Sequence, residues 1–396
     1  MTRLVSVEEA HERMMRLFAP LDTEEVALVR AAGRVLARDV VAPRDQPPFD
    51  ASAMDGYAIR AADSVPGTRL KVTGTSAAGT RFSGMVGAGE AIRIYTGAPV
   101  PEGADAVLIQ ENATREGDTL IVGEHGGSTN IRPAAGDFKA GSRVAAPRRL
   151  EARDLALIAA MNAGRVTVAR RPIIALIATG DELVMPGEEP GPDQIIASNG
   201  FGLKAMLDAA GADARLLPIA RDTPESLMAS FDLAAGADLI VTIGGASVGD
   251  FDLVQSTAVA EGLELDFYKV AMRPGKPLMA GRLRGMPMVG LPGNPVSAMV
   301  CGQIFLRPAV DRMLGLPGGL PTPLPARLTK PVEANGPRPH FMRARVVIGD
   351  TGWQCTPGSL QDSSHLRVLS EANALMVRPP NDPERAVGDE VGFIWI

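Results

Sequence analysis

Cysteine is scarce in this sequence. Only Cys301 and Cys355 occur among 396 residues, and they stand far apart without histidines at metal-ligand spacing. This scarcity argues against a disulfide framework and against a structural zinc site. The simplest interpretation is that both are small, buried apolar residues.

Basic clusters and membrane-spanning segments are also lacking. The formal net charge is −6, and no Lys and Arg cluster is interleaved with aromatic residues, so nucleic acid and anionic membranes are poor candidate partners. The first residues, MTRLVSVEEAHERMMRLF, lack the apolar core of a signal peptide. One uncharged run, residues 285–306, is long enough to span a bilayer, but its prolines and glycines argue against that. We therefore expect a cytoplasmic protein.

The length predicts two to four domains at about 150 residues per domain. Ser6 and Glu9 form a capping box before a first helix, and a second helical pattern spans residues 30–39. From Arg69 to Val144 the pattern predicts five short strands, separated by turn residues: RLKVT, AIRIY, DAVLI, TLIV and RVAA. The segment 148–170 returns to a helical pattern. A small β module is thus expected to be inserted between two helical pieces of one domain.

Strand and helix patterns alternate regularly after residue 172. Expected strands at 173–178, 215–219 and 239–243 alternate with helices that begin at Asn199, at Pro224 and near residue 253. Ser198 and Thr223 are placed to cap the first two helices, and Gly211 to end the first. This alternation predicts a doubly wound α/β domain. After a proline-rich linker, alternating stretches at the end of the chain predict a small β barrel or sandwich.

A glycine-rich turn follows the strand at 239–243. Gly244, Gly245 and Gly249 let backbone N–H groups approach a ligand, and Ser247 adds a hydroxyl, which suits a phosphate or a pterin edge. Asp250 and Asp252 come directly after this turn. By itself the pattern is equally compatible with an ordinary strand-to-helix turn of an α/β fold.

Carboxylates follow the ends of three expected strands: Asp181 and Glu182, then Asp222, then Asp250 and Asp252. Ligands of such sheets bind beyond the carboxyl ends of the strands, so we expect these acidic side chains to converge on one crevice. Hard carboxylate ligands beside a phosphate cradle favour Mg²⁺.

Positive charge and anion-binding groups come later in the chain. Lys269, Arg273 and Lys276 lie in a loop stiffened by proline and glycine; they supply local positive charge, or are three solvated cations of a hairpin. In LPGNPVS, residues 291–297, a helix begins after Asn294 and places Ser297 and backbone N–H groups at its N-terminus, a suitable anion site. The segment FDASAMDGYAI, which carries Asp50 and Asp55, is either an ordered functional loop or a solvated turn. Thr96 follows an expected strand, in a loop that Pro99 and Pro101 stiffen.

Six motifs together resemble one known family, the molybdopterin molybdenumtransferases, or MoeA family, which includes the gephyrin E domain. They are FDASAMDGYA at 49–58, RIYTGAPVPEGADAV at 93–107, ATGDEL at 178–183, GGASVGDFD at 244–252, KVAMRPGKP at 269–277 and LPGNPVSA at 291–298. The resemblance spans most of the chain in the family's order. It departs from the family's usual pattern at Arg273, where lysine is frequent, and at Asp362 and Ser364, where glycines are usual.

The resemblance implies a multidomain α/β plus β protein. Its domains would be an extended helical domain at 1–43 and 144–170, an inserted β domain at 44–143, a molybdopterin-binding α/β domain at 171–317 and a C-terminal β barrel at 318–396. It further implies a Mg²⁺-dependent transferase that takes molybdate and adenylylated molybdopterin and releases AMP. The active site would be shared between the subunits of a homodimer, and the adenylyltransferase that supplies the substrate is a candidate partner.

The resemblance also implies roles for individual residues. The catalytic set would be Asp55, Thr96, Glu182, Asp222, Asp252, Lys269 and Lys276, with Glu182, Asp222 and Asp252 as metal ligands. The substrate and its phosphates would be bound by Asn199, Gly244, Gly245, Ser247, Gly249, Pro292, Gly293 and Asn294. Molybdate would be bound by Arg273, Lys276, Pro295, Ser297, Arg343 and Ser363. Asp55 and Thr96 would act from the other subunit.

Two rival functions differ in what they require of the sequence. A molybdopterin adenylyltransferase would keep GGASVGDFD but lack the inserted β domain and the barrel, and patterns for both are present. A non-catalytic scaffold or sensor on the same fold would have lost acidic and basic site positions, which are all in place. Both observations favour the transferase.

Overall fold

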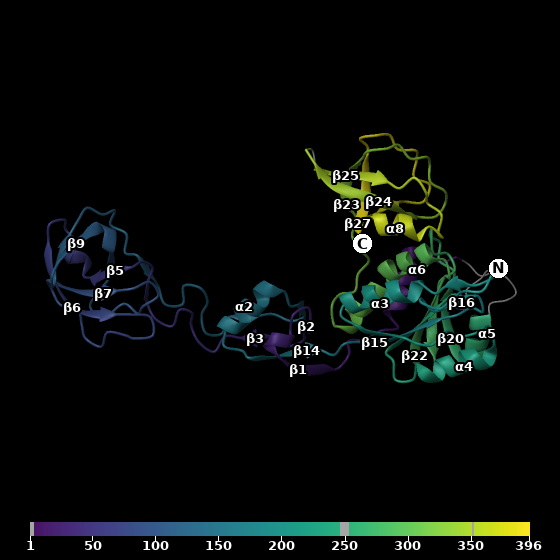
Figure 1. Ribbon diagram of the computed structural model, residues 1–396, viewed down its shortest axis with the longest axis horizontal. Coiled ribbons are helices and arrows are strands. Elements are labelled where there is room, and N and C mark those ends of the chain that lie inside the picture. The colour runs from purple at the N-terminus through teal and green to yellow at the C-terminus, as the bar shows by residue number, and fades with distance from the viewer. Residues whose placement is uncertain (1–3, 246–252, 351) are drawn as a thin grey trace. The chain divides into compact units, whose positions relative to one another are not determined.

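The computed structural model describes residues 4–245, 253–350 and 352–396 (Figure 1). The chain forms two compact units. The larger unit comprises Met1–Glu24, Gly33–Ala37 and Val168–Ile396, and the smaller comprises Glu25–Ala32 and Arg38–Thr167. The finer division into four domains stays a prediction.

A six-stranded sheet of order β18-β15-β19-β22-β21-β20 forms the centre of the larger unit. Its strands are β15 (Ile173–Ala178), β18 (Asp213–Leu216), β19 (Leu239–Ile243), β20 (Leu263–Tyr268), β21 (Met279–Leu283) and β22 (Met286–Leu291). Neighbouring strands from β18 to β22 pair in parallel, and β21 and β20 continue antiparallel. The predicted strands at 173–178 and 239–243 are confirmed. The strand expected at 215–219 instead lies at Asp213–Leu216, so its end was placed too far along the chain.

Helices cover both faces of this sheet (Figure 1). On one face, buried side chains of α3 (Asn199–Ala209), α6 (Pro295–Cys301), the π-helix η4 (Gly302–Leu306) and α7 (Arg307–Met313) form a core with α1 (Val7–Met15). On the other face, α4 (Pro224–Leu233) and α5 (Leu253–Ala260) form a second core. This arrangement confirms the doubly wound α/β domain.

The helix ends follow the local sequence in most cases. The side chains of Ser6 and Thr223 accept hydrogen bonds from the backbone N–H groups of Glu9 and Ser226, so these two caps are confirmed. Gly211, at φ +106°, follows the end of α3 as predicted. The predicted cap by Ser198 is wrong: its backbone is already helical and its side chain makes no capping hydrogen bond.

The C-terminal strands close into a barrel of order β23-β25-β24-β26-β27. They are β23 (Leu324–Leu328), β24 (His340–Gly349), β25 (Gly352–Pro357), β26 (Ala374–Arg378) and β27 (Glu390–Trp395), with α8 (Leu366–Glu371) between β25 and β26. Alternate inward residues such as Val346, Cys355 and Phe393 fill the interior. A β-bridge between Arg273 and His340 joins the barrel to the loop between β20 and β21.

The smaller unit is built on a six-stranded sheet of order β8-β5-β7-β6-β10-β9. Its strands are β5 (Gly56–Ile59), β6 (Arg69–Ser76), β7 (Glu90–Ile94), β8 (Ala106–Ile109), β9 (Ala113–Glu116) and β10 (Thr119–Val122), with short 3₁₀ helices η2 (Ala61–Asp63) and η3 (Gln110–Asn112). Four of the five predicted strands lie in this sheet. The fifth, β12 (Arg143–Val144), pairs outside it with β3 (Val40–Val41), and β4 (Ala51–Ser52) pairs with β11 (Ile131–Arg132).

Two helical predictions are corrected by the structure. Residues 30–39 are not a helix: the 3₁₀ turn η1 (Leu28–Arg30) is followed by Gly33 at φ +71° and by strand β2 (Val35–Leu36). The segment 148–170 is helical only in α2 (Ala152–Ala160), and its ends are strands β13 (Arg148–Arg149) and β14 (Arg165–Ala169). A four-stranded sheet of order β1-β14-β2-β13 is formed by β2, β13 and β14 together with β1 (Thr23–Ala27). The small parallel pair β16 (Leu183–Val184) and β17 (Ile195–Ile196) completes the elements.

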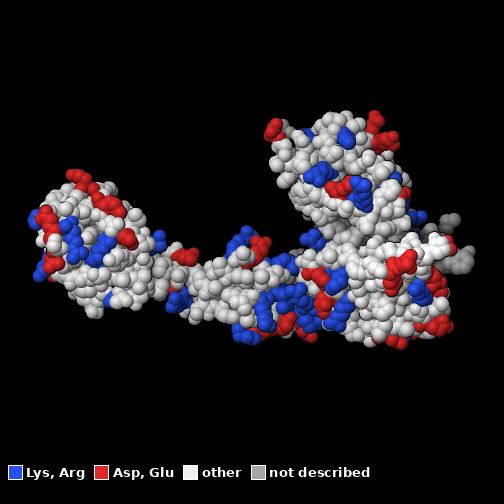
Figure 2. Space-filling view, in the orientation of Figure 1, with Lys and Arg blue, Asp and Glu red and all other residues white. Residues whose placement is uncertain are grey.

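Basic and acidic side chains are interspersed on the face of the molecule drawn in Figure 2. On that face, a small anion would therefore be attracted by individual basic side chains near its binding site, not by one broad positive surface. Within the described ranges, no helix combines the length and the apolar character needed to cross a membrane.

Candidate functional site

A wide crevice of about 1370 Å³ lies at the carboxyl ends of the parallel strands in the larger unit. The chain runs from β15 to β18 on one side and from β19 toward β20 on the other, so these connections leave the neighbouring strands β15 and β19 in opposite directions. This topological switch point is where open α/β sheets bind ligands. The crevice lining includes nine of the residues predicted from the sequence: Glu182, Asn199, Asp222, Gly244, Gly245, Pro292, Gly293, Asn294 and Pro295.

The turn after β19 requires glycine at two successive positions. Gly244 and Gly245 have φ values of +103° and +65°, a region that side chains rarely adopt. A Cβ at Gly245 would lie 2.1 Å from Cγ2 of Val254, and one at Gly244 would lie 2.7 Å from the carbonyl oxygen of Thr179. The backbone therefore faces the crevice without side chains. The predicted Ser247, Gly249 and Asp252 lie outside the described residues.

Thr179 was missed by the sequence reasoning. Its side chain is buried at the end of β15 and lines the crevice, yet its Oγ1 has no hydrogen-bond partner among the described residues. Buried hydroxyl groups are rarely left unpaired, and this oxygen, which is shielded from solvent, is one of the exceptions among the described residues. Its place in ATGDEL, directly after a buried strand, was the available signal.

Two residues with carboxylate side chains line the crevice, and they belong to different loops. Glu182 follows β15, and a Cβ at Gly180 would lie 2.4 Å from its Oε2, so the carboxylate folds back over that glycine. Asp222 precedes α4, and its backbone N–H donates to Oδ1 of Asp181 at 3.1 Å. Both side chains belong to exposed residues that line the crevice.

These carboxylates fit a hard divalent cation by donor type. Among the residues at 4–245, 253–350 and 352–396, no group of three or more His, Cys, Asp or Glu could hold a metal ion. Mg²⁺, however, commonly takes only one or two protein carboxylates and completes its coordination with water and substrate phosphate. Glu182 and Asp222 are suited to that mode.

The N-terminus of α6 is joined to the barrel. The side chain of Asn294 donates from Nδ2 to Oγ of Ser363 at 2.9 Å, and the N–H of Val296 donates to the carbonyl of Ser363 at 3.1 Å. Asn199 donates from Nδ2 to the carbonyl of Gly293 at 2.7 Å. Ser297 is buried in the first turn of the helix. Several predicted substrate and molybdate residues are thus brought together here.

The loop that carries Ser363 contains its own charged group. Oδ1 of Asp362 accepts hydrogen bonds from Oγ of Ser364 at 2.6 Å and from its N–H at 2.9 Å. These two bonds, the side-chain one first, lower the pKa of Asp362. Ser364 lines the crevice, a position that the sequence reasoning had not selected.

Arg343 holds this loop from inside the barrel. Its side chain is fully buried, and its guanidinium donates to the carbonyls of Leu360 at 3.0 Å, Gln361 at 3.2 Å and Asp362 at 2.8 Å. Burial lowers the pKa of Arg343, and Asp362 opposes this shift. The geometry gives Arg343 a supporting role, because both of its Nη atoms bond to the loop backbone.

The three predicted cations lie in the connection between β20 and β21. Nζ of Lys269 lies 4.6 Å from the ring centroid of Tyr268. Arg273 is exposed, and its backbone bonds to Pro339 and Phe341 at the barrel. Lys276 is half-buried, and the next residue, Pro277, lines the crevice. None of the three cations is itself among the lining residues.

Asp55 and Thr96 lie together in the smaller unit. Oδ1 of Asp55 accepts hydrogen bonds from the N–H of Thr96 at 2.8 Å and from its Oγ1 at 2.7 Å. These bonds, the backbone one first, lower the pKa of Asp55. Thr96 is exposed and Asp55 is partly exposed, and the two are held together by these hydrogen bonds.

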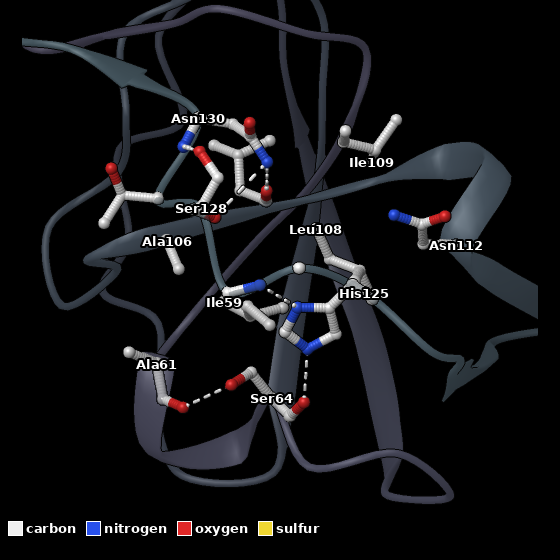
Figure 3. Close-up of a pocket in the computed structure, with 14 residues that line it drawn as sticks. Ile59, Ala61, Ser64, Ala106, Leu108, Ile109, Asn112, His125, Ser128 and Asn130 are labelled. Carbon is white, nitrogen blue, oxygen red and sulfur yellow. Dashed lines mark hydrogen bonds between the residues drawn. The ribbon is translucent and has the colours of Figure 1, made fainter.

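A second cavity, of about 100 Å³, lies in the smaller unit and contains none of the predicted site residues (Figure 3). His125 places Nε2 at 2.6 Å from the carbonyl of Ser64, so Nε2 carries the proton and Nδ1 accepts from the N–H of Gly127. Asn130 donates from Nδ2 to the carbonyl of Val107 at 2.9 Å. These polar groups hold the loop at 125–130 against the sheet. We therefore interpret them as structural rather than as a binding site.

Comparisons with protein families cover nearly the whole chain. Residues 5–162 match the MoeA N-terminal region (domain I and II), residues 175–312 a probable molybdopterin binding domain, and residues 325–396 the MoeA C-terminal region (domain IV). Matches to the N-terminal and C-terminal regions disfavour the adenylyltransferase rival, which was expected to lack both.

Individual relatives agree with this. The chain is 33% identical to the molybdopterin molybdenumtransferase of Nostoc sp. over 95% of this chain and 89% of that protein. It is 36% identical to molybdopterin molybdenumtransferase 2 of Mycobacterium tuberculosis over 98% and 99%. The solved structure of the molybdopterin biosynthesis MoeA protein from Pyrococcus horikosii superposes with a TM-score of 0.84 and 32% identity, covering 99% of both chains. The chain therefore belongs to the molybdopterin molybdenumtransferase (MoeA) family, transferases of molybdenum cofactor biosynthesis.

Proposed function

We propose that the protein binds adenylylated molybdopterin and molybdate in this crevice, releases AMP and leaves molybdenum on the dithiolene of molybdopterin. Water would add to a phosphorus of the phosphoanhydride, whose bridging P–O bond breaks to give AMP and the phosphate of molybdopterin. The observation that carries the proposal is the combination, in one crevice, of the bare backbone turn at Gly244 and Gly245 with the carboxylates of Glu182 and Asp222.

The proposed site residues fall into groups according to the part of the substrates that each would bind. The pyrophosphate would lie along the glycine turn, with Asn199 and the 292–294 segment at its side. A Mg²⁺ ion held by Glu182 and Asp222, with Asp252 as a predicted further ligand, would neutralise phosphate charge. Lys269 would act with Lys276 as a cation of the catalytic set.

Molybdate is a dianion and needs donors and positive charge. We propose that Arg273, Lys276, Ser363 and the Pro295–Ser297 turn bind it, with Arg343 holding the Ser363 loop rather than contacting the anion. The negative charge of Asp362, which is next to Ser363, would repel the molybdate dianion. The affinity for molybdate would therefore depend on the positive charges of Arg273 and Lys276. The presence of Arg273 where the family often has lysine favours bidentate contact with an oxyanion.

The first test measures AMP release from adenylylated molybdopterin with Mg²⁺, with and without molybdate, together with reconstitution of a cofactor-free molybdenum enzyme. Molybdate-dependent AMP release with reconstitution would support the proposal. Tight substrate binding without either signal would instead favour a scaffold or sensor. Adenylylation of free molybdopterin by ATP would favour an adenylyltransferase.

We further propose a homodimer in which Asp55 and Thr96 complete the crevice of the other subunit. Two inactive variants, Asp55→Asn and Asp222→Asn, test this when they are mixed and refolded together. A shared site leaves one intact site in each mixed dimer, so activity should return to about a quarter of wild type. No recovery in demonstrably mixed dimers, or a fully active monomer, would overturn the shared site. The cytoplasmic location and the link to an adenylyltransferase stay predictions.

A further inference from the structure

Among the described residues, the guanidinium of Arg221 bonds to backbone groups rather than to an acidic side chain. Nη1 lies 3.0 Å from the carbonyl oxygen of Asp181, 3.2 Å from that of Leu183 and 3.5 Å from that of Gly180. A guanidinium nitrogen of this kind has two protons, so the two shorter contacts are its main hydrogen bonds and the third is shared. The Arg221 guanidinium thus contacts three carbonyl oxygens of a single turn.

The two shorter bonds fix the chain on both sides of Glu182. Asp181 and Leu183 are its immediate neighbours, and Gly180 is the residue over which its carboxylate folds. Gly180 itself has φ +149°, and its N–H donates to the carbonyl of Ala220 at 3.1 Å. The orientation of the Glu182 carboxylate therefore depends on a turn that Arg221 closes.

The same residue is adjacent in the chain to the second carboxylate, Asp222. The N–H of Arg221 donates to Oγ of Ser226 at 2.9 Å, which anchors it to the first turn of α4. The N–H of Asp222 donates to Oδ1 of Asp181 at 3.1 Å. The hydrogen bonds of Arg221 and of its neighbour Asp222 therefore connect the loop after β15 to the loop before α4.

We propose that Arg221 is a positioning residue that sets the spacing of the Glu182 and Asp222 carboxylates for a divalent cation. This inference rests on the proposed function, because it assumes that the two carboxylates hold the cation. Groups that orient metal ligands commonly change metal affinity by roughly 10–100-fold when removed. Arg221 does so through peptide groups and needs no contact with the metal or the substrate.

The test compares Arg221→Ala and Arg221→Lys with wild type in the full-length protein. Mn²⁺ alone serves as the probe, and its binding is measured from the electron paramagnetic resonance signal of the free ion. Arg221→Ala should raise the Kd for Mn²⁺ by about tenfold or more. Arg221→Lys should give a smaller increase, because an ammonium can bond to some of the same carbonyls. Arg215→Ala is the matched control: this exposed arginine bonds to Asp213 at 2.7 Å, and its loss should leave Mn²⁺ affinity unchanged.

A second readout separates positioning from loss of folding. Ethylguanidinium at low millimolar concentration should restore Mn²⁺ binding to Arg221→Ala but have no effect on wild type. Equal Mn²⁺ affinity in wild type and Arg221→Ala would overturn the positioning role while leaving the proposed function intact. Absence of Mn²⁺ binding in wild type would overturn this inference and the metal part of the proposal, and the AMP-release assay would report separately on the reaction.

Discussion

One carboxylate oxygen of Asp55 accepts two hydrogen bonds from Thr96, from its N–H at 2.8 Å and from its Oγ1 at 2.7 Å. Both donors stabilise the charged form, so the pKa of Asp55 is lowered. The residue is partly exposed, and its orientation is set by groups of its own chain. The pair is thus a preformed acidic group on the smaller unit.

We predict that Thr96→Val raises the pKa of Asp55 toward its ordinary value, because the Oγ1 bond is lost and only the N–H bond remains. Thr96→Ser keeps the hydroxyl and should behave like wild type. Carboxyl ¹³C chemical shifts followed against pH give the titration, and AMP release gives the functional effect. Identical titration curves for Asp55 in the valine and serine variants would contradict this.

The glycine turn at the crevice gives a prediction about stability. Gly245→Ala combines a positive φ with a Cβ placed 2.1 Å from Val254, whereas Gly236→Ala has φ +82° and no neighbouring atom within 4 Å. The control should therefore lose only about 1 kcal/mol of unfolding free energy. Gly245→Ala should lose roughly 1–3 kcal/mol more through overpacking.

Urea denaturation measures both losses. Adding Val254→Ala to Gly245→Ala removes the clashing methyl group, so the double variant should lose less than the sum of the two single variants. Strict additivity would show that the contact between positions 245 and 254 is not the cause.

His340 should make the protein less stable in acid. It is 6% exposed, and burial followed by the charges of Arg273, Arg343, Arg378 and Arg338 lowers its pKa to about 4. Above pH 6.5, His340 is neutral in both the folded and the unfolded chain. As the pH falls from 6.5 toward 4, the unfolded chain gains a proton that the folded chain does not, so up to about 3 kcal/mol of stability is lost.

His340→Leu should therefore flatten the dependence of stability on pH between 7 and 4 relative to wild type. Urea denaturation at several pH values provides the comparison, with His365→Gln, at an exposed position, expected to follow wild type. If the leucine variant loses as much stability as wild type in acid, another group is responsible.

The barrel contains a buried ion pair whose removal should be costly. Arg378 is 2% exposed and donates from Nε to Asp382, which also accepts from Arg385. Burial by itself would raise the pKa of Asp382, but the hydrogen bonds from Arg385 and Arg378 outweigh it, and the pKa is lowered. Asp382→Asn leaves Arg378 without its counter-charge and should cost about 3–5 kcal/mol.

Arg385→Gln is the control for that experiment, because the Arg385 side chain is 36% exposed. Its removal should cost no more than about 1 kcal/mol. Comparable losses of unfolding free energy for the two variants would contradict a special role for the buried partner.

The sequence predicted the α/β sheet well because its strands are continuous apolar runs between turn residues. Ile173–Ala178 and Leu239–Ile243 end where the turn residues begin. The strand at Arg165–Ala169 was missed, although buried Val166 and Val168 stand on either side of the less buried Thr167, because the helical pattern just before it was extended too far. At residues 30–39 the error has a similar source: Gly33 turns the chain after one 3₁₀ turn.

The crevice was predictable because parallel strands bring their carboxyl ends to one edge. The contacts of Arg343 and Ser363 were not, since their partners are backbone carbonyls and an asparagine 69 residues away. Such pairings leave no local pattern in a sequence. Arg221 was overlooked for the same reason, because its acceptors are peptide groups.

The carbonyl of Ser363 occupies the N–H of Val296 in the first turn of α6. An anion that took this donor would first have to displace the barrel loop from it. Anion binding at this turn and seating of the barrel loop would thus compete for one proton, so the two equilibria are linked. Tightening either would weaken the other, so affinity for an anion at the proposed Pro295–Ser297 turn would fall as the barrel loop is seated more firmly.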